Sequence, residues 1–433
     1  MADRQPHVVI VVVNLPAERD RRVIRECRAL ESAGYRATVI CPRGPARPGV
    51  LLGTTGTAIR SFPQPLAGTG VLSFALEFAW ALTAVTVRLL ALMLRTRVDA
   101  VQVCNPPDIF WPLALVVRAV GRPFVFDHHD LSPELYECKT DRPHPVVLRV
   151  LRLCERLSWR CASAVVATNE SYRRLAISRG GCDPDRVVVV RNGPTLAEVG
   201  SGPPGHTDPA DSGAGRIPTP RTGPDRVRRT IVYLGVINPQ DHVETAVLAA
   251  EELARRRGRT DWRLVVAGDG ESLPELRRLS VERGIDDVVE FTGWLEADEV
   301  DGLLHAATLA VQPDPPTRMA QLSTMAKTVE YVARGLPVVA VDLLETRRTA
   351  GEAARYVPNG TPDELAGALD ALLDDDPARA EMSRVARDRF TGSLAWDHQE
   401  RAYLALWRRL LPGTAAAPTT TDRKATRWTS STS

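Results

Sequence analysis

Two residues of opposite charge, Lys327 and Glu330, lie three apart in the segment "STMAKTVEYVARGLPVVA", residues 323–340. On a helix this spacing places both side chains on one face. A phosphate near the start of such a helix would meet backbone N–H groups, the positive end of the helix dipole and the ammonium of Lys327. The carboxylate one turn deeper is suited to accept hydrogen bonds from sugar hydroxyls. The alternative is a surface ion pair that contributes only about a few tenths of a kcal/mol.

The residues on either side of this pair favour the phosphate site. The chain has only three lysines, which are Lys139, Lys327 and Lys424. Ser323 or Thr324 is expected to cap a short helix, because a hydroxyl can accept from the free N–H groups of the first turn. Gly335 can end the helix in a left-handed conformation, and Pro337 prevents its continuation into the buried strand that follows. The lysine is therefore expected in the first turns of a helix that starts at a cleft.

A second polar run, "DHHD" at residues 127–130, follows the apolar segment "PFVF" and is expected at the edge of a sheet. Neighbouring residues of an extended segment point in opposite directions, so His128 and His129 cannot both face one point. Two adjacent histidines with aspartates lack the spacing of metal ligands, and we expect no metal site here. Asp130 and Glu134 could equally be capping groups of the helix that starts next.

The elements that must position these residues alternate along the chain. The first half contains the apolar runs "VVIVVV", "ATVIC", "VDAVQV", "PFVFD", "AVVAT" and "RVVVV", and the second contains "TIVYLG", "WRLVVAGDG", "VVEFTGW", "TLAVQ" and "PVVAVD". Helical patterns separate these runs, which predicts βαβ units and parallel sheets covered by helices on both faces. The expected fold class is α/β, with two Rossmann-like doubly wound parallel-sheet domains facing a cleft at the carboxyl ends of their strands.

Composition sets the expected domain boundaries. Residues 1–199 form the first Rossmann-like domain, and residues 200–228, dense in Gly, Pro, Ser and Asp, form a linker or a disordered insertion. Residues 229–391 form the second domain. A helix at 392–411 could pack on either domain, with the amino-terminal one as an option, and residues 412–433 read as a disordered tail.

Bulk properties limit the location and the partners of the chain. Its 433 residues are enough for two cores, and a net charge of +2 gives no sign of a nucleic-acid partner. Seven scattered cysteines without a CxxC pair indicate reduced thiols and hence a cytoplasmic location. The apolar run Val8–Val13 is short and lacks a cleavage site, so we interpret it as a strand and not as a signal peptide.

A membrane contact is a further expectation. The most apolar segment, Val71–Leu94, is interrupted by Glu77 and Arg88, which argues against a spanning helix. It is either a buried crossover helix or a helix lying in the membrane interface. The aromatic residues that would insert are Phe74, Phe78 and Trp80. A basic stripe of Arg149, Arg152, Arg156 and Arg160, weakened by Glu155, would suit an anionic leaflet but could also be a solvated face.

Four motifs together resemble one known family. The segment around Lys327 is similar to the donor-binding region of retaining GT-B glycosyltransferases of family 4, in a subgroup with the motif "STMNK" before an "EYM" helix. "VYLGVINPQDHVETAV" resembles the turn "GPQDGVD" of that subgroup, and "CNPPDIFWPLAL" with "FDHHDLSPELYE" resembles its amino-terminal signature. "VVVRNG" resembles the segment that closes the first domain. The resemblance covers most of residues 7–411.

The resemblance implies roles for individual residues. Lys327 would contact the donor diphosphate and Glu330 the nucleotide ribose, while His129 or Asp130 would orient the acceptor hydroxyl. The other implied donor-binding residues are Gly235, Asn238, Gln240, Gly268, Gly293, Ser323 and Thr324. The implied acceptor-side residues are Asn105, Asp108, His128 and Glu134. The glycines are equally well explained by tight turns that need a positive φ.

Two departures from the family pattern affect the donor site. The family often has two glutamates separated by seven residues, and Leu322 occupies the position of the first one. Many relatives also have Arg and Lys in the loop after the first strand of the second domain, where this chain has Val236, Asn238 and Gln240. Lys327 would then carry more of the phosphate charge, with Arg318 as a possible second cation.

The expected activity is transfer of a sugar from a nucleotide-diphosphate-sugar donor to a glycan or lipid-linked acceptor. By resemblance it would proceed with retention, without metal or cofactor, with the leaving phosphate as the proton acceptor, and in polysaccharide or glycoconjugate synthesis at the inner face of the plasma membrane. A sugar-nucleotide epimerase of the same architecture and a non-catalytic nucleotide-sugar binding protein are the alternatives. A nicotinamide dehydrogenase is disfavoured because neither first strand is followed by GxGxxG.

Overall fold

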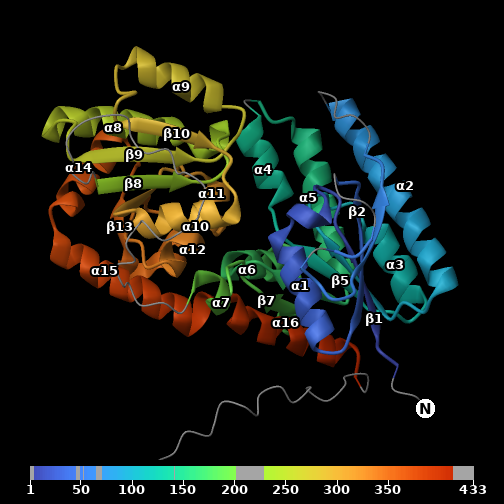
Figure 1. The fold of residues 1–433 in the computed structure, drawn as a ribbon. Helices are drawn as coiled ribbons and strands as arrows, with labels where there is room; N and C mark the ends of the chain where they lie inside the picture. Colours follow the sequence, from blue (N-terminus) through green and yellow to red (C-terminus); the bar gives the residue numbers. More distant parts are fainter. Residues whose placement is uncertain are drawn as a thin grey trace, which may run out of the picture.

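Two parallel sheets, each covered by helices on both faces, make up the chain (Figure 1), and this confirms the predicted α/β architecture. The computed structural model describes residues 4–44, 49–51, 53–64, 71–140, 142–200 and 229–412. The predicted linker and tail lie almost entirely outside the described residues.

The amino-terminal sheet has seven strands in the order β3-β2-β1-β4-β5-β6-β7. They are β1 (His7–Val11), β2 (Arg36–Pro42), β3 (Ala58–Phe62), β4 (Ala100–Cys104), β5 (Phe124–His128), β6 (Ala164–Ala167) and β7 (Val187–Val189). The helices around it are α1 (Arg21–Ser32), α2 (Val71–Arg95), α3 (Trp111–Ala119), α4 (Ser132–Lys139), α5 (Pro145–Cys161), α6 (Glu170–Ser178) and α7 (Leu196–Val199). Every residue of β1 is buried, as expected for a strand covered on both faces.

The carboxyl-terminal sheet has six strands in the order β10-β9-β8-β11-β12-β13. They are β8 (Arg229–Leu234), β9 (Trp262–Ala267), β10 (Val289–Gly293), β11 (Leu309–Gln312), β12 (Val338–Val341) and β13 (Ala354–Val357). The helices are α8 (Val243–Arg257), α9 (Leu273–Glu282), α10 (Ala297–Ala306), α11 (Arg318–Leu322), α12 (Ala326–Ala333), α13 (Leu344–Ala350), α14 (Pro362–Leu373), α15 (Asp376–Arg389) and α16 (Trp396–Leu410). Short 3-10 turns are η1 (Ala17–Arg19), η2 (Pro184–Arg186), η3 (Pro239–Asp241) and η4 (Gly351–Ala353), and η5 (Phe390–Leu394) is a π-helical turn.

The order of strands reverses beside the first strand of each sheet. In the amino-terminal sheet β1 pairs with β2 and β4, and in the carboxyl-terminal sheet β8 pairs with β9 and β11. Loops that leave these strands on opposite faces of a sheet open a crevice at the carboxyl ends, where ligands of such sheets bind. The candidate residues of both domains follow these strands or their neighbours.

The last helix returns to the first domain. Trp396, Tyr403 and Trp407 of α16 are buried in the same apolar cluster as Val23 and Leu30 of α1. The Tyr403 hydroxyl donates to Gln102 Oε1 at 2.8 Å, on β4. Figure 1 shows α16 running beneath the amino-terminal domain. The helix therefore ties the two domains together at the end of the chain.

Helix α12, which carries Lys327, begins at Ala326, two residues after Thr324, the second of the two predicted capping residues. Met325 is the N-cap of α12 and contributes no capping side chain, whereas Ser323 closes the preceding helix α11. The prediction that Ser323 or Thr324 caps α12 is therefore wrong, because both hydroxyls bond to other partners. Gly335 adopts a φ of +67° just after the helix, which confirms the predicted left-handed end.

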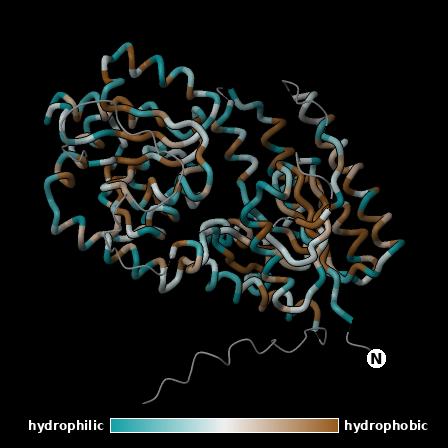
Figure 2. Tube along the Cα trace, in the orientation of Figure 1, coloured by the Kyte–Doolittle hydropathy of each residue, from teal (hydrophilic) through white to brown (hydrophobic). Residues whose placement is uncertain are grey.

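Helix α2 packs one side on the sheet and leaves the other uncovered. Val85 and Leu89 are fully buried, but Leu76, Val87 and Leu94 are 63%, 59% and 89% exposed. Figure 2 shows apolar residues along this outer helix as well as in both sheets. By length and composition Leu76–Arg95 could span a membrane, with a mean hydropathy of 1.6 and 28% of the segment buried. The expectation of a buried crossover helix holds for the sheet side only.

Candidate active site

Lys327 lies beneath the loops that leave β8 and β11. Its Nζ is 2.7 Å from Asp314 Oδ1 and 3.5 Å from Asp241 Oδ1, and it stands 5.1 Å from the centre of the Tyr233 ring. Burial alone would lower the pKa of Lys327, but the carboxylates of Asp314 and Asp241 raise it above its usual value. The side chain is therefore a buried cation held by two acids from two loops.

This cluster has unused bonding capacity. An ammonium has three N–H donors, and two aspartates use at most two of them. Asp314 Oδ2 is buried and has no hydrogen-bond partner among the described residues. A buried polar atom of this kind costs free energy unless something satisfies it. The cluster can therefore still donate to, and accept from, a bound ligand.

The alternative of an ion pair between Lys327 and Glu330 is not found among the described residues. Glu330 instead bonds to Arg334 at 2.6 Å and lies 4.0 Å from Arg21 Nη1 of the amino-terminal domain. It lines a pocket of about 430 Å³ between α1 and the helices α10 and α12. Other charged residues of this pocket are Arg25, Arg28, Glu198, Asp298 and Asp301. Glu330 thus faces a cleft between the domains.

Two of the predicted glycines are required by close approach. A Cβ on Gly268 would lie 1.8 Å from the carbonyl oxygen of Gly235, and the two residues have φ values of +144° and +154°. The β8–α8 and β9–α9 loops therefore touch beside Lys327, whose Cε would lie 3.2 Å from a Cβ on Gly235. Gly293 also has a positive φ, +72°, but its Cβ would meet nothing within 4 Å. Gly293 therefore fits the alternative of a simple turn.

The polar donor-side residues have mixed environments. Asn238 Oδ1 accepts from the backbone N–H of Glu271 at 3.3 Å, and it connects the same two loops. Gln240 is half-buried within η3. Ser323 and Thr324 hydroxyls bond to residues of the amino-terminal domain, Tyr172 and Asn169. Their predicted contact with a donor would have to come from their backbone.

On the amino-terminal side, Asn105 organises the "DHHD" loop. Its Oδ1 accepts from the backbone N–H groups of His129 at 2.5 Å and Asp130 at 3.2 Å. Its Nδ2 donates to Asp108 Oδ1 at 3.0 Å and to the carbonyl of Asp130 at 2.7 Å. Asn105 and Asp108 are buried, so they act on the shape of the loop.

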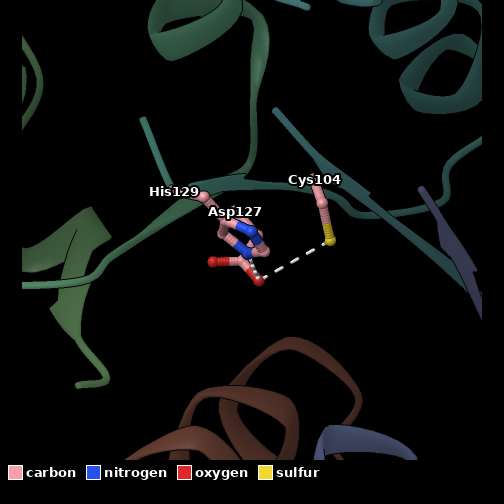
Figure 3. A group of neighbouring side chains, drawn as sticks. All are labelled: Cys104, Asp127 and His129. Atoms are coloured by element: carbon pink, nitrogen blue, oxygen red, sulfur yellow. Dashed lines mark hydrogen bonds and ion pairs between the residues drawn. The ribbon is translucent and has the colours of Figure 1, made fainter. Parts of the chain in front are cut away.

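His129 is oriented by Asp127, which was expected at the edge of the sheet but not among the site residues. Its Nε2 lies 2.8 Å from Asp127 Oδ2 (Figure 3), and the imidazole is 15% exposed. Burial opposes ionisation of Asp127, but Arg22 and His129 hold its pKa well below the usual range. Asp127 and His129 are two residues apart at the end of a strand, so their side chains lie on the same face. This spacing could have predicted from the sequence that the two side chains pair.

Asp127 is the centre of a buried network. Arg22 Nη2 lies 3.0 Å from its Oδ1, and Gln102 Nε2 donates to its Oδ2 at 3.0 Å. Glu26 joins through Arg22 at 3.0 Å, and burial beside Asp127 raises its pKa well above the usual value. The network fixes the imidazole of His129 in one orientation.

Cys104, Asp127 and His129 also have the composition of a metal site, with ligand atoms within 4.8 Å of one another (Figure 3). The surroundings do not favour a cation. Burial and the charge of Asp127 raise the pKa of Cys104 well above its usual value, so the thiol stays protonated. Arg22 already neutralises Asp127. A divalent ion would have to compete with a guanidinium that is itself buried.

His128, Asp130 and Glu134 have different surroundings. His128 is fully buried against the rings of Phe126, Trp159 and Tyr172, and burial with nearby Arg179 lowers its pKa to about 3. It cannot reach a ligand directly. Helix α4 begins after Leu131 without a capping side chain, so Asp130 and Glu134 are not the caps that the alternative assumed.

Glu134 connects the domains, whereas Asp130 faces solvent. Glu134 lies 2.7 Å from Arg179 and 3.5 Å from Arg318, the second cation considered for the donor phosphate. Arg318 is therefore partly engaged with the amino-terminal domain. The side chain of Asp130 is exposed at the surface. It is accessible to a ligand.

Comparison with known proteins covers both domains. Residues 20–193 match the family described as glycosyl transferase 4-like domain, and residues 228–375 match glycosyl transferases group 1. A D-inositol 3-phosphate glycosyltransferase of Frankia alni is 30% identical over 70% of this chain and 72% of its own length. This relative is similar across both domains.

Solved structures share the fold. Sucrose-phosphate synthase of Thermosynechococcus elongatus superposes with a TM-score of 0.70 at 15% identity, covering 94% of this chain and 99% of that one. The Anabaena protein HepE, solved in complex with UDP, gives a TM-score of 0.62 at 15% identity, covering 94% of this chain and 100% of that one. At these identities the likeness shows a two-domain GT-B fold.

Proposed function

The chain belongs to the GT-B glycosyltransferases of family 4 type, and on that premise we propose that it transfers a sugar from a nucleotide diphosphate donor. The donor would bind at the carboxyl ends of β8 and β11, and the acceptor beside His129 and Asp130. Membership of this family favours a transferase over the epimerase and the binding protein that the sequence left open.

The Lys327 cluster is the observation that carries the proposal. One ammonium proton is free of the two aspartates, and Lys327 itself belongs to the first turn of α12, whose leading backbone N–H groups have no capping side chain. The touching loops at Gly235 and Gly268 let backbone approach a diphosphate closely. Glu330 faces the cleft one turn further, where its carboxylate would accept hydrogen bonds from the ribose hydroxyls. UDP is the ligand of the similarly folded HepE, which supports a nucleotide donor.

For the chemical step we propose retention without a metal ion. The bond between the anomeric carbon and the leaving phosphate oxygen breaks as the acceptor oxygen attacks from the same face. The acceptor proton moves to that phosphate oxygen. Preorganised charge from Lys327 and the start of α12 would stabilise the departing diphosphate, while His129, fixed by Asp127, would orient the acceptor hydroxyl.

Calorimetric titration with UDP and GDP in the presence of a chelator tests the donor site. One of the two is expected to bind, and Lys327→Ala is expected to weaken binding by about 1.5 to 3 kcal/mol, as for a charge-assisted hydrogen bond. Lys139→Ala is the matched control, because Lys139 is exposed on α4. Equal binding by both variants, or no binding of either nucleotide, would contradict the proposal.

For the acceptor we propose a glycan or lipid-linked molecule at the inner face of the plasma membrane, in polysaccharide or glycoconjugate synthesis. The uncovered side of α2 supports this location, since it presents Leu76, Val87 and Leu94 to solvent. Helix α5 adds Val146, Val150 and Leu153, and the predicted stripe of Arg149, Arg152, Arg156 and Arg160 is exposed. Glu155, which was expected to weaken the stripe, is buried and faces Arg179.

Sedimentation with lipid vesicles tests the membrane contact. We expect binding to phosphatidylglycerol-rich vesicles and little to pure phosphatidylcholine, with a loss at high salt. Leu76→Glu should abolish binding. Val281→Glu is the control, because Val281 on α9 is also 63% exposed but lies in the other domain. If both variants bind as the parent does, α2 is not the contact.

A further inference from the structure

We infer that Asn169 and Tyr172 of the amino-terminal domain are positioning residues for the donor-domain segment Leu322–Thr324. This segment, at the junction of α11 and α12, leads directly into the helix of Lys327. The inference rests on the proposed function only in taking Lys327 as the donor contact. The segment includes Leu322, which occupies the position of the first glutamate of the two-glutamate family pattern.

Asn169 uses both ends of its amide, one for each domain. Its Oδ1 accepts from the backbone N–H of Tyr172 at 2.8 Å and so caps α6. Its Nδ2 donates to the carbonyl of Leu322 at 2.9 Å and to Thr324 Oγ1 at 3.2 Å. The side chain is fully buried, where an unpaired amide would be costly. Asn169 therefore fixes the position of the donor-domain segment Leu322–Thr324 relative to the start of α6.

Tyr172 adds a second connection from the first turn of the same helix. Its hydroxyl lies 3.0 Å from Ser323 Oγ, and its ring is 2% exposed. The centre of its ring lies 5.0 Å from the centre of the His128 ring. His128 directly precedes His129, so Tyr172 touches both the donor segment and the loop that carries the candidate acceptor residue.

Leu322 is an apolar residue at the position where the family pattern often has a glutamate. It packs against the apolar cluster of the amino-terminal domain that contains Trp159, Val165 and Tyr172. A glutamate at this position would bring a carboxylate to that cluster, at a cost in desolvation. The residue that departs from the family pattern therefore packs its side chain on the other domain, as the side chains of Ser323 and Thr324 also do.

A buried acid supports the same interface. Glu345 on α13 is fully buried and accepts from Ser171 Oγ at 2.6 Å, and Arg191 of the amino-terminal domain lies 3.7 Å from it. Thr324 Oγ1 reaches Glu345 Oε2 at 3.5 Å. Asn169 and Tyr172 therefore contact the stretch 322–324 directly, and Ser171 is connected to it through Glu345. The stretch ends three residues before Lys327. We infer that these contacts set the distance between the donor phosphate contact and the acceptor loop.

Hydrogen–deuterium exchange of the protein without ligand tests the role of Asn169. Asn169→Asp keeps an acceptor for the α6 cap but has no donor for Leu322 or Thr324, whereas Asn169→Ala loses both functions. We expect both variants to speed exchange in residues 318–328 by about tenfold, the factor for one lost hydrogen bond. Only Asn169→Ala should speed exchange in α6. If Asn169→Asp leaves residues 318–328 unchanged, Asn169 is a helix cap and the inference is wrong.

Paired substitutions test Tyr172 and Leu322. Tyr172→Phe and Ser323→Ala should each speed exchange in residues 318–328, and the double variant should add little, because both remove the same contact. Tyr356→Phe is the control, since it loses a hydroxyl bond to Gly351 within one domain and should leave this stretch unchanged. If the effects of Tyr172→Phe and Ser323→Ala on the exchange rates are additive, the two hydroxyls do not stabilise this segment through one shared contact.

The last comparison is between Leu322→Glu and Leu322→Met. Leu322→Glu should speed exchange in residues 318–328, whereas Leu322→Met keeps the side-chain volume and should leave exchange there unchanged. Equal exchange in these two variants would show that Leu322 is no anchor. All of these measurements are made without nucleotide. A failure to bind UDP or GDP would therefore count against the proposed function and leave the positioning role to be decided by exchange alone.

Discussion

The two charged clusters, one at the carboxyl end of β5 and the other around Lys327 at the start of α12, are built differently. Around His129, Arg22 and Asp127 are paired, Glu26 has a raised pKa, and Gln102 bonds to both acids, so the charges nearly balance. Around Lys327, two aspartates outnumber one ammonium, and Asp314 Oδ2 has no partner. The first cluster is a closed network that presents one imidazole. The second is an open one that a ligand could complete.

The largest expected effect comes from breaking the closed cluster. Arg22→Met leaves Asp127 and Glu26 buried without their cation, which should cost about 3 to 5 kcal/mol of stability in the amino-terminal domain. Urea unfolding followed by tryptophan fluorescence measures this. Arg384→Met is the control, because its partners Glu381 and Asp388 are exposed and its loss should leave the midpoint unchanged. Similar midpoints for both variants would contradict the view of a closed network.

The next largest effect on stability is expected from a substitution that disturbs the loop backbone beside Lys327. Gly268→Ala places a Cβ 1.8 Å from the Gly235 carbonyl at a φ of +144°, and we expect a cost of about 2 to 4 kcal/mol with loss of nucleotide binding. Gly293→Ala has open space and should cost only about 1 to 2 kcal/mol for its positive φ. Thermal unfolding and calorimetry of both variants check the order, and a reversed order would refute the close approach of the two loops.

Substituting the presented imidazole should separate chemistry from binding. His129→Gln is expected to slow sugar transfer by about 100-fold, the low end for a positioned polar group, while nucleotide affinity stays the same. The stability should change little, because His129 lies at the rim of the network. Steady-state kinetics with the donor found by calorimetry provide the test. A variant that loses nucleotide binding instead would place His129 on the donor side.

The most gradual effect is a pH dependence of stability from His128, behind the same loop. The unfolded chain protonates this residue below pH 6.5, whereas the folded state keeps it neutral down to about pH 3. Stability should therefore fall as the pH drops through this window, by about 1.4 kcal/mol per unit. His128→Phe should remove this part of the slope between pH 6 and 4, which are values inside that window. Parallel curves for parent and variant would show that His128 is protonated in the fold.

Local sequence was sufficient for the elements. Apolar runs of four to six residues gave buried parallel strands, because such runs can only be covered from both sides. Gly335 and Pro337 marked the end of α12, since backbone geometry there is a property of the residue itself. The positions of Lys327 near a helix start and of "DHHD" at a strand end followed from the same local rules.

The partners of the site residues were decided only by the tertiary structure. Asp314 and Asp241 meet Lys327 from two different loops, and Arg22 reaches Asp127 from across the domain. The capping hydroxyls predicted for α12 bond to another domain, because a buried amide at Asn169 and a buried hydroxyl at Tyr172 needed partners. Spacing along the chain places a residue on an element, but which charges and hydroxyls pair depends on how distant elements pack and exclude water.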